Sequence, residues 1–197
     1  KHQSPYVRGW VIQLSWDGGK SPSPEMVKQF AVMAQQDSSP VVRLFIAAAL
    51  QHVALPERWA TLEALTRHAE DADDHNLPLM YWYAAEPLAA VDPGRALKLG
   101  LSCGKTIPLL RKFMIRRIAS IDGAEALASL VQSVADSDDA GEQLELIAGM
   151  RQALLQAERL GRESLAEIRR TVGLLAPEGT GTAAPMPAAT DIAQLVN

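Results

Sequence analysis

The residues with the most obvious capacity for chemistry form an acidic segment at 70–76, flanked by His68 and ending beside His75. Closely spaced carboxylates suit Ca²⁺. Read as an EF-hand loop from Asp71, however, the segment has no glycine at its sixth position, and Trp82 stands where the bidentate glutamate belongs. We therefore predict no metal here. We expect a polar turn between helices whose side chains cap helix ends.

A second unusual segment follows at Tyr81, Trp82 and Glu86, with His75 just before it. A carboxyl group beside an aromatic wall could act as a general acid or base in a surface groove. Pro87 lies within this apolar segment and should bend the helix, because it removes a backbone hydrogen bond. These four side chains are a candidate small-molecule or redox site.

The alternative for Glu86 is structural. Apolar residues surround it in the sequence, so it should be partly buried and in need of a partner. We favour an ion pair with an arginine of a neighbouring helix, such as Arg43 or Arg116. Structural ion-pair networks also contain carboxyl groups with perturbed pKa values, so such a group need not be functional.

No catalytic residue is predicted. The single cysteine, Cys103, excludes an internal disulfide and a Cys-x-x-Cys-His haem site within this chain, and burial is the usual fate of such a thiol. The chain also has no Gly-x-Ser-x-Gly or His-Glu-x-x-His motif. Its apolar runs fall short of the ~18 residues that would span a bilayer, so we expect no membrane insertion.

Charge is arranged in blocks. Residues 63–92 and 122–145 are strongly acidic, whereas residues 93–121 hold seven basic residues and no acidic one. In a stack of helices these blocks are neighbours, so we expect opposite charges to pair across adjacent units. The alternative is nucleic-acid binding by 93–121. The acidic flanks and the net charge of −4 disfavour it.

The elements that would position these residues follow a repeat. Pro5, Pro40, Pro78 and Pro108 each precede a long apolar stretch, at spacings of 35, 38 and 30 residues. Proline suits the first turn of a helix, where its missing N–H needs no partner. The spacing is typical of one helix–turn–helix unit per repeat. Ser39 and Asn76 could cap two of these helices.

Between these helices we expect second helices near 25–36, 56–68, 93–101 and 124–134, each with apolar residues at helical spacing. A last, longer pair is predicted at 141–157 and 164–175. No segment alternates as a half-buried strand does. The prediction is an all-α protein, an α-α superhelix of the HEAT/armadillo-like kind with about four to five helix pairs.

The turn ahead of Pro40 resembles the Asp…Pro-x-Val-Arg signature of HEAT repeats. In that family the aspartate and arginine tie neighbouring repeats together, which implies those roles for Asp37 and Arg43. Arg8 and Arg111 match the arginine position. We call the series of aspartate–arginine contacts between successive repeats the ladder, and each contact a rung. Tyr81 occupies the arginine position in the third repeat, so we expect the ladder to be interrupted there.

A closer resemblance covers about residues 4–155. Residues 38–44, 71–83 and 86–88 are similar to the HEAT-containing portion of large proteins from planctomycetes and verrucomicrobia, named membrane-bound dehydrogenases. Those proteins combine a propeller resembling sorbosone dehydrogenases, a helical repeat region and a cytochrome c domain. The resemblance implies an exported polypeptide with haem c elsewhere in it. It transfers no catalytic residue and no cofactor to this chain, and the N-terminus itself identifies no compartment.

Residues 1–175 are therefore predicted to form a HEAT-like repeat domain, and residues 176–197, rich in proline, glycine and alanine, a linker or tail with a short terminal helix. The leading hypothesis is a scaffold that docks protein partners or neighbouring domains. The alternatives are a small-molecule or redox site at Tyr81, Trp82 and Glu86, and nucleic-acid binding by 93–121.

Overall fold

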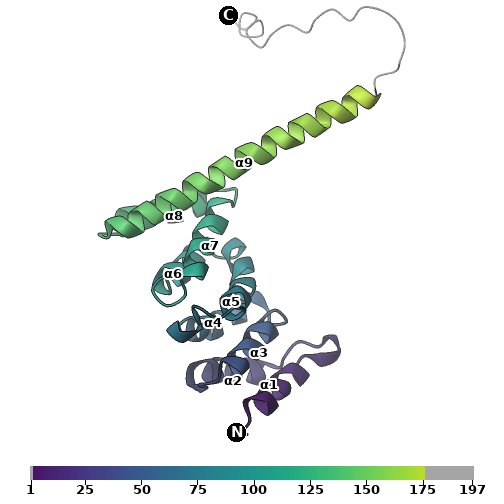
Figure 1. Cartoon of the computed structure of the whole chain (residues 1–197), viewed down its shortest axis with the longest axis vertical. Helices are drawn as coiled ribbons and strands as arrows, with labels where there is room; N and C mark the ends of the chain where they lie inside the picture. The colour runs from purple at the N-terminus through teal and green to yellow at the C-terminus, as the bar shows by residue number, and fades with distance from the viewer. Residues whose placement is uncertain (1, 176–197) are drawn as a thin grey trace, which may run out of the picture. The chain divides into compact units, whose positions relative to one another are not determined.

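The fold is all-α, as predicted, in a computed structural model that describes residues 2–175 (Figure 1). No strand occurs in this part of the chain. The chain divides into two compact units, residues 1–158 and 159–197. The predicted tail at 176–197 lies outside the described residues.

The described residues form nine α-helices and four short 3₁₀ helices. The α-helices are α1 (Pro5–Leu14), α2 (Pro24–Gln36), α3 (Pro40–Leu50), α4 (Trp59–Leu65), α5 (Leu77–Ala85), α6 (Pro93–Ser102), α7 (Pro108–Ala119), α8 (Ala124–Asp136) and α9 (Ala140–Leu175). The 3₁₀ helices are η1 (Asp17–Gly19), η2 (Leu55–Glu57), η3 (Ala69–Asp71) and η4 (Glu86–Ala90).

The four prolines of the repeat begin equivalent helices. Pro5, Pro40 and Pro108 are the first residues of α1, α3 and α7, and Pro78 is the second residue of α5. We call α1, α3, α5 and α7 the first helices and α2, α4, α6 and α8 the second helices of four repeats. This confirms the repeat that the sequence predicted.

The predicted caps are wrong in detail. Ser39 and Asn76 stand at the N-cap positions of α3 and α5, but neither side chain caps its helix. Aspartates two residues earlier bind the backbone instead. Asp37 Oδ1 accepts from the Ser39 N–H at 3.0 Å, and Asp74 Oδ1 accepts from the N–H groups of Asn76 and Leu77. A carboxylate is the stronger acceptor for these exposed amides.

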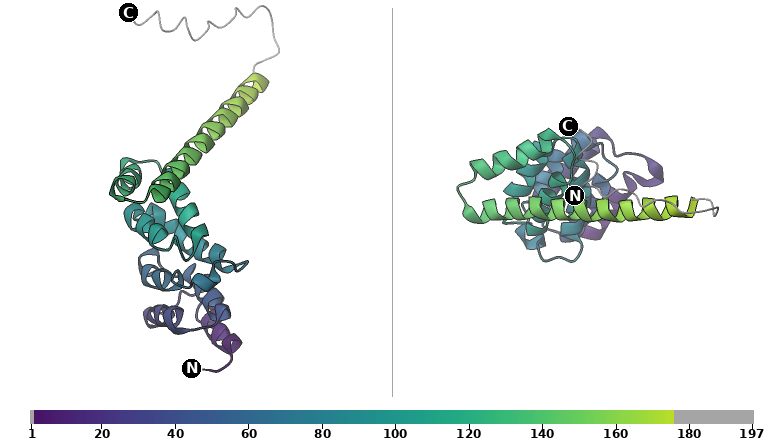
Figure 2. Two further views of the ribbon diagram at one scale, coloured as in Figure 1. Left: turned by 60° about the vertical axis from the view of Figure 1, so that its left-hand side comes forward. Right: turned by 90° about the horizontal axis from the view of Figure 1, so that it is seen from above.

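Within residues 2–158 the first helices stack on one another in chain order, α1 on α3, α3 on α5 and α5 on α7 (Figures 1 and 2). Second helices lie beside them, with α2 against α4 and α6 against α8. Because α3 and α5 have neighbours on both sides, their apolar residues are covered almost all round, including Ile46 and Leu50. This accounts for the high apolar content of α3 and α5.

Pro87 ends α5 rather than kinking it. The α-helix stops at Ala85 and continues as η4, since proline cannot supply the next helical hydrogen bond. The buried guanidinium of Arg58 binds the carbonyl groups exposed here and at the end of α3. It donates to Val53 O at 2.8 Å, and to Ala84 O and Gln51 O at 3.2 Å each.

The predicted last helix pair is wrong. Residues 140–175 form the single helix α9 instead of separate helices at 141–157 and 164–175. The residues between them contain no proline. One glycine, Gly161, costs only about 1 kcal/mol in a helix interior, and Arg159 and Glu163 are ion-paired one turn apart. The described part of the chain therefore has four helix pairs followed by a long single helix.

Candidate binding groove

A buried ionic cluster joins the second and third repeats. Arg43 on α3 donates from Nε and Nη2 to the two carboxylate oxygens of Asp71, at 2.6 and 2.5 Å. The Tyr81 hydroxyl on α5 donates to Asp71 Oδ2 at 2.6 Å. All three residues are at most 1% exposed. Burial and the Asp71 carboxylate raise the pKa of the Tyr81 phenol, so this hydroxyl remains a donor.

A second rung joins the first and second repeats. Arg8 on α1 donates from Nε and Nη2 to Asp37, at 2.7 and 2.8 Å. Arg43 Nη1 reaches back to the Asp37 carbonyl oxygen at 3.2 Å. Burial opposes ionisation of Asp37, but the hydrogen bonds from Arg8 and from the Ser39 N–H outweigh it and hold the pKa of Asp37 below its ordinary value. Asp37 thus links the arginines of two repeats.

The ladder has no rung between the third and fourth repeats, where Tyr81 stands at the arginine position. Tyr81 joins the rung behind it through Asp71, whereas the turn ahead of α7 offers no carboxylate, because Lys105 stands three residues before Pro108. The ladder resumes beyond it. Arg111 on α7 lies 2.8 Å from Glu145 and 3.5 Å from Glu142 of α9.

The candidate site at Tyr81, Trp82, Glu86 and His75 does not converge on one cavity. Tyr81 is buried in the ionic cluster, and Trp82 packs edge-on against Phe113 with ring centroids 5.4 Å apart. His75 is exposed in the turn ahead of α5. None of these four residues lines the groove described below.

Glu86 pairs with Arg117 of α7, not with the expected Arg43 or Arg116. Arg43 is already bound to Asp71. Successive residues of a helix point about 100° apart, so Arg117 can reach Glu86 where its neighbour Arg116 does not. The carboxylate and the guanidinium are each about one-third exposed, as a surface ion pair would be.

The charge blocks pair as expected. Arg95 binds Glu63 at 3.1 Å, Arg117 binds Glu86, and Arg111 binds the acidic start of α9. Each pair links the basic block 93–121 to one of its acidic flanks. Three of the seven basic residues of this block are therefore paired with acidic residues within the chain.

A cavity of about 1030 Å³ runs along the second helices α4, α6 and α8. We call it the groove. It opens because α4 is only seven residues long and does not pack closely on α6. Thr106 bridges its base, donating from Oγ1 to the Thr66 carbonyl at 2.6 Å. The lining residues are Glu63, Thr66, Arg67, Asp92, Gly94, Arg95, Leu97, Lys98, Leu99, Ser102, Cys103, Thr106, Ser129, Gln132, Ser133 and Asp136.

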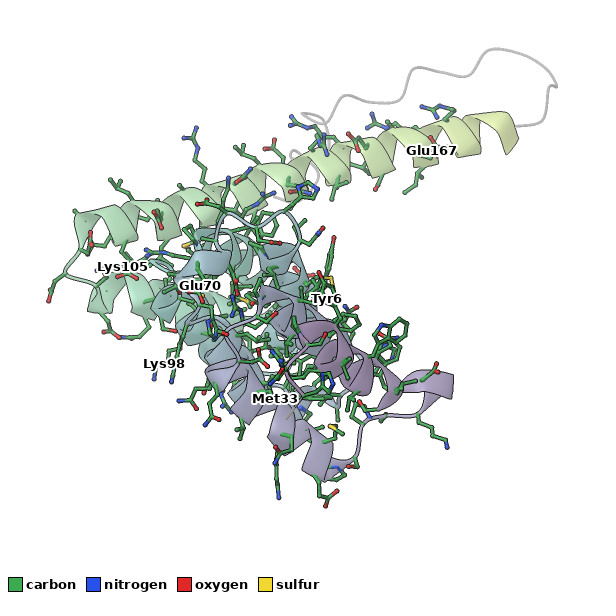
Figure 3. The ribbon with its side chains drawn as sticks, turned by 60° about the horizontal axis from the view of Figure 1, so that its bottom comes forward. Tyr6, Met33, Glu70, Lys98, Lys105 and Glu167 are labelled. Carbon is green, nitrogen blue, oxygen red and sulfur yellow. The ribbon has the colours of Figure 1, made fainter. Side chains whose placement is uncertain are left out.

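Two cations of the groove have no ion-pair partner in the described part of the chain, although the groove's three basic and three acidic lining residues balance in formal charge. Arg95 is held by Glu63 and lies over the ring of Trp59, 4.4 Å from its centroid. Among the described residues, by contrast, the exposed side chains of Arg67 and Lys98 have no hydrogen bond and no ion pair. Figure 3 labels Lys98, whose side chain extends outward from the ribbon.

The acidic lining residues already accept hydrogen bonds. Asp92 caps α6 by accepting from the Arg95 N–H at 2.8 Å, and Asp136 accepts from Gln132 Nε2 at 2.6 Å. Both donors are uncharged, so these two carboxylates keep their negative charge in the groove.

Cys103 lies in the floor of the groove but is a poor nucleophile. It is 3% exposed, and burial raises the pKa of its thiol to about 12. No histidine lines the groove. The arrangement is suited to binding more than to covalent chemistry.

Sequence reasoning missed or misassigned four residues that matter here. Arg58 donates to carbonyl groups at the ends of α3 and α5. The sequence signal for burial of Arg58 was its position just after Pro56 and ahead of an apolar helix. Arg67 and Lys98 belong to different charge blocks, so nothing in the sequence placed them in one groove. Asp71 was expected to cap a helix and instead is the buried centre of the cluster.

In residues 2–175 no group of histidine, cysteine and acidic side chains could hold a metal ion. Nor is any helix of that part both long and apolar enough to cross a membrane. No family model, curated protein or solved structure matches the chain. Its resemblance to the dehydrogenase family therefore stays an expectation from the residues.

The buried cluster predicts a large, specific stability loss. Asp71→Ala would leave the Arg43 guanidinium buried with only the exposed Glu70, 3.4 Å away, as an acidic neighbour. Removing one partner of a buried pair costs about 3–5 kcal/mol. We expect urea unfolding to show a loss of that order. The exposed neighbour Asp73→Ala should change stability by less than about 0.5 kcal/mol. Equal, small effects of both substitutions would contradict the role of Asp71.

The Arg8–Asp37 rung predicts a pH dependence. Because the folded pKa of Asp37 is depressed, its contribution is present above the ordinary value of 3.8 and is lost as the pH falls through the folded value. The Asp37→Asn variant should therefore have a lower melting temperature than the parent at pH 7. This difference in melting temperature should shrink progressively below about pH 4. Thermal melts from pH 7 to 2.5 measure this, with Asp73→Asn as the control. A gap that stays constant at all pH values would count against the rung.

Proposed function

We propose that this chain is a helical-repeat docking module that binds an extended, acidic polypeptide segment in the groove. The observation that carries the proposal is that Arg67 and Lys98, two cations without an ion-pair partner among the described residues, lie in a groove that runs along three successive second helices. Stacked helix pairs use such faces to bind extended partners.

The size of the groove suits a peptide. Packed helices lie about 8–10 Å apart and α4 does not pack closely on α6, so a path across α4, α6 and α8 is at least roughly 20 Å long. An extended chain rises about 3.3 Å per residue, so about six residues would cover it. Lining hydroxyls such as those of Ser129 and Ser133 keep free acceptor capacity for backbone N–H groups of the ligand.

Charge selects the kind of segment. Acidic side chains of the ligand could pair with Arg67 and Lys98, whereas a basic segment would meet them unfavourably. By the family resemblance, the segment would come from a neighbouring domain of the same exported polypeptide, in which the propeller carries dehydrogenase chemistry and the cytochrome domain carries haem c. The module itself would then position domains and would not react.

Nucleic acid is the weaker alternative. The internal ion pairs of Arg95, Arg111 and Arg117 reduce the charge that block 93–121 could offer to phosphates. A small-molecule or redox site is also less favoured, because Tyr81 is buried and Glu86 is paired.

The proposal predicts selective peptide binding. A fluorescein-labelled peptide of about ten residues that alternates glutamate with leucine should bind in fluorescence anisotropy. The lysine analogue and a single-stranded oligonucleotide should bind more weakly. The double variant Arg67→Glu with Lys98→Glu should lower the affinity for the acidic peptide about tenfold, since each lost charge contact is worth up to about 1 kcal/mol.

A control double variant, Lys20→Glu with Lys28→Glu, makes the same change in net charge at exposed positions outside the groove. It should bind the peptide as the parent does at physiological salt, because distant exposed charges are screened. Equal weakening in both double variants, or tighter binding of the oligonucleotide, would contradict the proposal.

A further inference from the structure

A further pocket lies between α7 and the N-terminal part of α9, within residues 1–158. Its volume is about 320 Å³, near the lower end of the range of about 300–1,000 Å³ that is usual for small-molecule sites. It shares no lining residue with the groove. We call it the α7–α9 pocket, and its lining residues are Gly104, Pro108, Arg111, Lys112, Ile115, Arg116, Glu145, Ala148, Gly149 and Gln152.

Positive charge prevails in the α7–α9 pocket. Three of its lining residues are basic and only Glu145 is acidic, so the lining has a formal charge of +2. In the groove, by contrast, the basic and acidic lining residues balance. Of the three cations, only Arg111 is ion-paired within the described part of the chain. It lies 2.8 Å from Glu145 and 3.5 Å from Glu142, so the surplus charge belongs to the other two.

Those two cations, Lys112 and Arg116, stand one turn apart on α7. Neither side chain has a hydrogen bond or an ion pair among residues 2–175. Arg116 is partly buried, and a charge removed from water is costly unless it is paired. Residues four apart in a helix lie on the same face, with Cβ atoms about 5–6 Å apart, so both cations can reach one ligand. An anion with two negative charges would match them.

Two close contacts at glycines shape the pocket. The helix α9 approaches α7 at Gly149, where a Cβ would be 2.4 Å from Ile115 Cγ2. The Arg111 side chain lies against Gly104, where a Cβ would be 2.4 Å from Arg111 Cδ. Both approaches need the missing side chain of glycine. They therefore fix α9 and the Arg111 guanidinium in place around the pocket.

The donors in the pocket suit a phosphate group. A phosphate monoester carries about −1.5 to −2 charges at pH 7 and has three strong acceptor oxygens. A guanidinium group matches two of these oxygens with parallel N–H donors, and a lysine binds phosphate as a point charge. The amide of Gln152 adds an uncharged donor. A single carboxylate, by contrast, would neutralise only one of the two cations that lack a partner.

Arg111 has donor capacity left for the same ligand. Its buried Nε–H, although close to Glu145, is not aligned to donate to it, and no other acceptor in the described part of the chain takes this hydrogen bond. Buried N–H groups in folded proteins are normally hydrogen-bonded. An acceptor oxygen in the pocket would therefore be favourable here.

Apolar side chains define the rest of the ligand. Pro108, Ile115 and Ala148 form the uncharged part of the lining together with the two glycines. They would contact the organic group of an ester and exclude water from it. Inorganic phosphate has no such group and would leave this part of the pocket empty.

We propose that the α7–α9 pocket binds a small phosphate monoester, with its phosphate group on Lys112 and Arg116 and its organic group against Pro108 and Ala148. This site is additional to the groove. It is tested by different variants, so neither proposal depends on the other.

Isothermal titration calorimetry of the full chain with phenyl phosphate tests the proposal. We expect saturable binding at one site. Inorganic phosphate should bind about tenfold more weakly, because it makes no apolar contact. Succinate should also bind more weakly than phenyl phosphate, because its two charges are on separate, planar groups that a tetrahedral site does not match.

The double variant Lys112→Gln with Arg116→Gln should lower the affinity for phenyl phosphate at least about tenfold, since it removes both charge-assisted contacts. Its matched control, Lys20→Gln with Lys28→Gln, removes the same charge at exposed positions outside the pocket and should bind as the parent does. Circular dichroism checks that both variants are folded.

A second pair of variants blocks the pocket without changing its charge. Ala148→Trp places a large side chain at an exposed lining position and should abolish binding of phenyl phosphate. Ala157→Trp makes the same change at an exposed position of the same helix outside the pocket and should leave binding unchanged.

Four outcomes would overturn the proposal. The first is a lack of saturable binding of phenyl phosphate, and the second is equal weakening in the control with both lysines replaced. The third is binding of inorganic phosphate or succinate as tight as that of phenyl phosphate. The fourth is a set of amide shifts in nuclear magnetic resonance that phenyl phosphate causes away from Gly104 and Gly149, which would assign the ligand to another site.

Discussion

The structure of the repeat stack depends on one buried interaction, the contact of Arg43 and Tyr81 with the Asp71 carboxylate. It fixes the register of α3 against α5 and holds the turn between them, since a shift of one helical turn would leave a charge buried without a partner. The same turn follows the end of α4, where Thr66 and Arg67 form one wall of the groove. The ionic cluster therefore determines where the groove lies as well as how the repeats stack.

Proline and apolar spacing made the helices predictable, because a proline at the first turn and a stripe at helical spacing are local properties. They predicted α2 and α6 to within one residue at each end. They failed for α9, where the weak breaking tendency of Gly161 was overestimated. Residue identity could not separate Asp71 from Asp73 and Asp74 within one acidic turn, since only the path of the chain decides which carboxylate faces α3.

The groove was not predictable for a related reason. Arg67, Lys98 and Ser133 come from three repeats, and only the arrangement of the second helices brings them to one groove. The charge blocks did predict that Arg95, Arg111 and Arg117 would find acidic partners, because neighbouring blocks are neighbouring helices in a stack. The sequence could not predict which cations would lack an acidic partner. Two of those cations, Arg67 and Lys98, are the ones that can bind a ligand in the groove.

Native-state hydrogen exchange across the whole chain tests the central role of the buried cluster most directly. If the cluster joins the repeats as described, the slowest amides will lie in α3 and α5, and protection will decline toward α1 and α8. A chain in which α3 and α5 exchange as fast as α1, or in which the slowest amides lie in α8, would contradict the account.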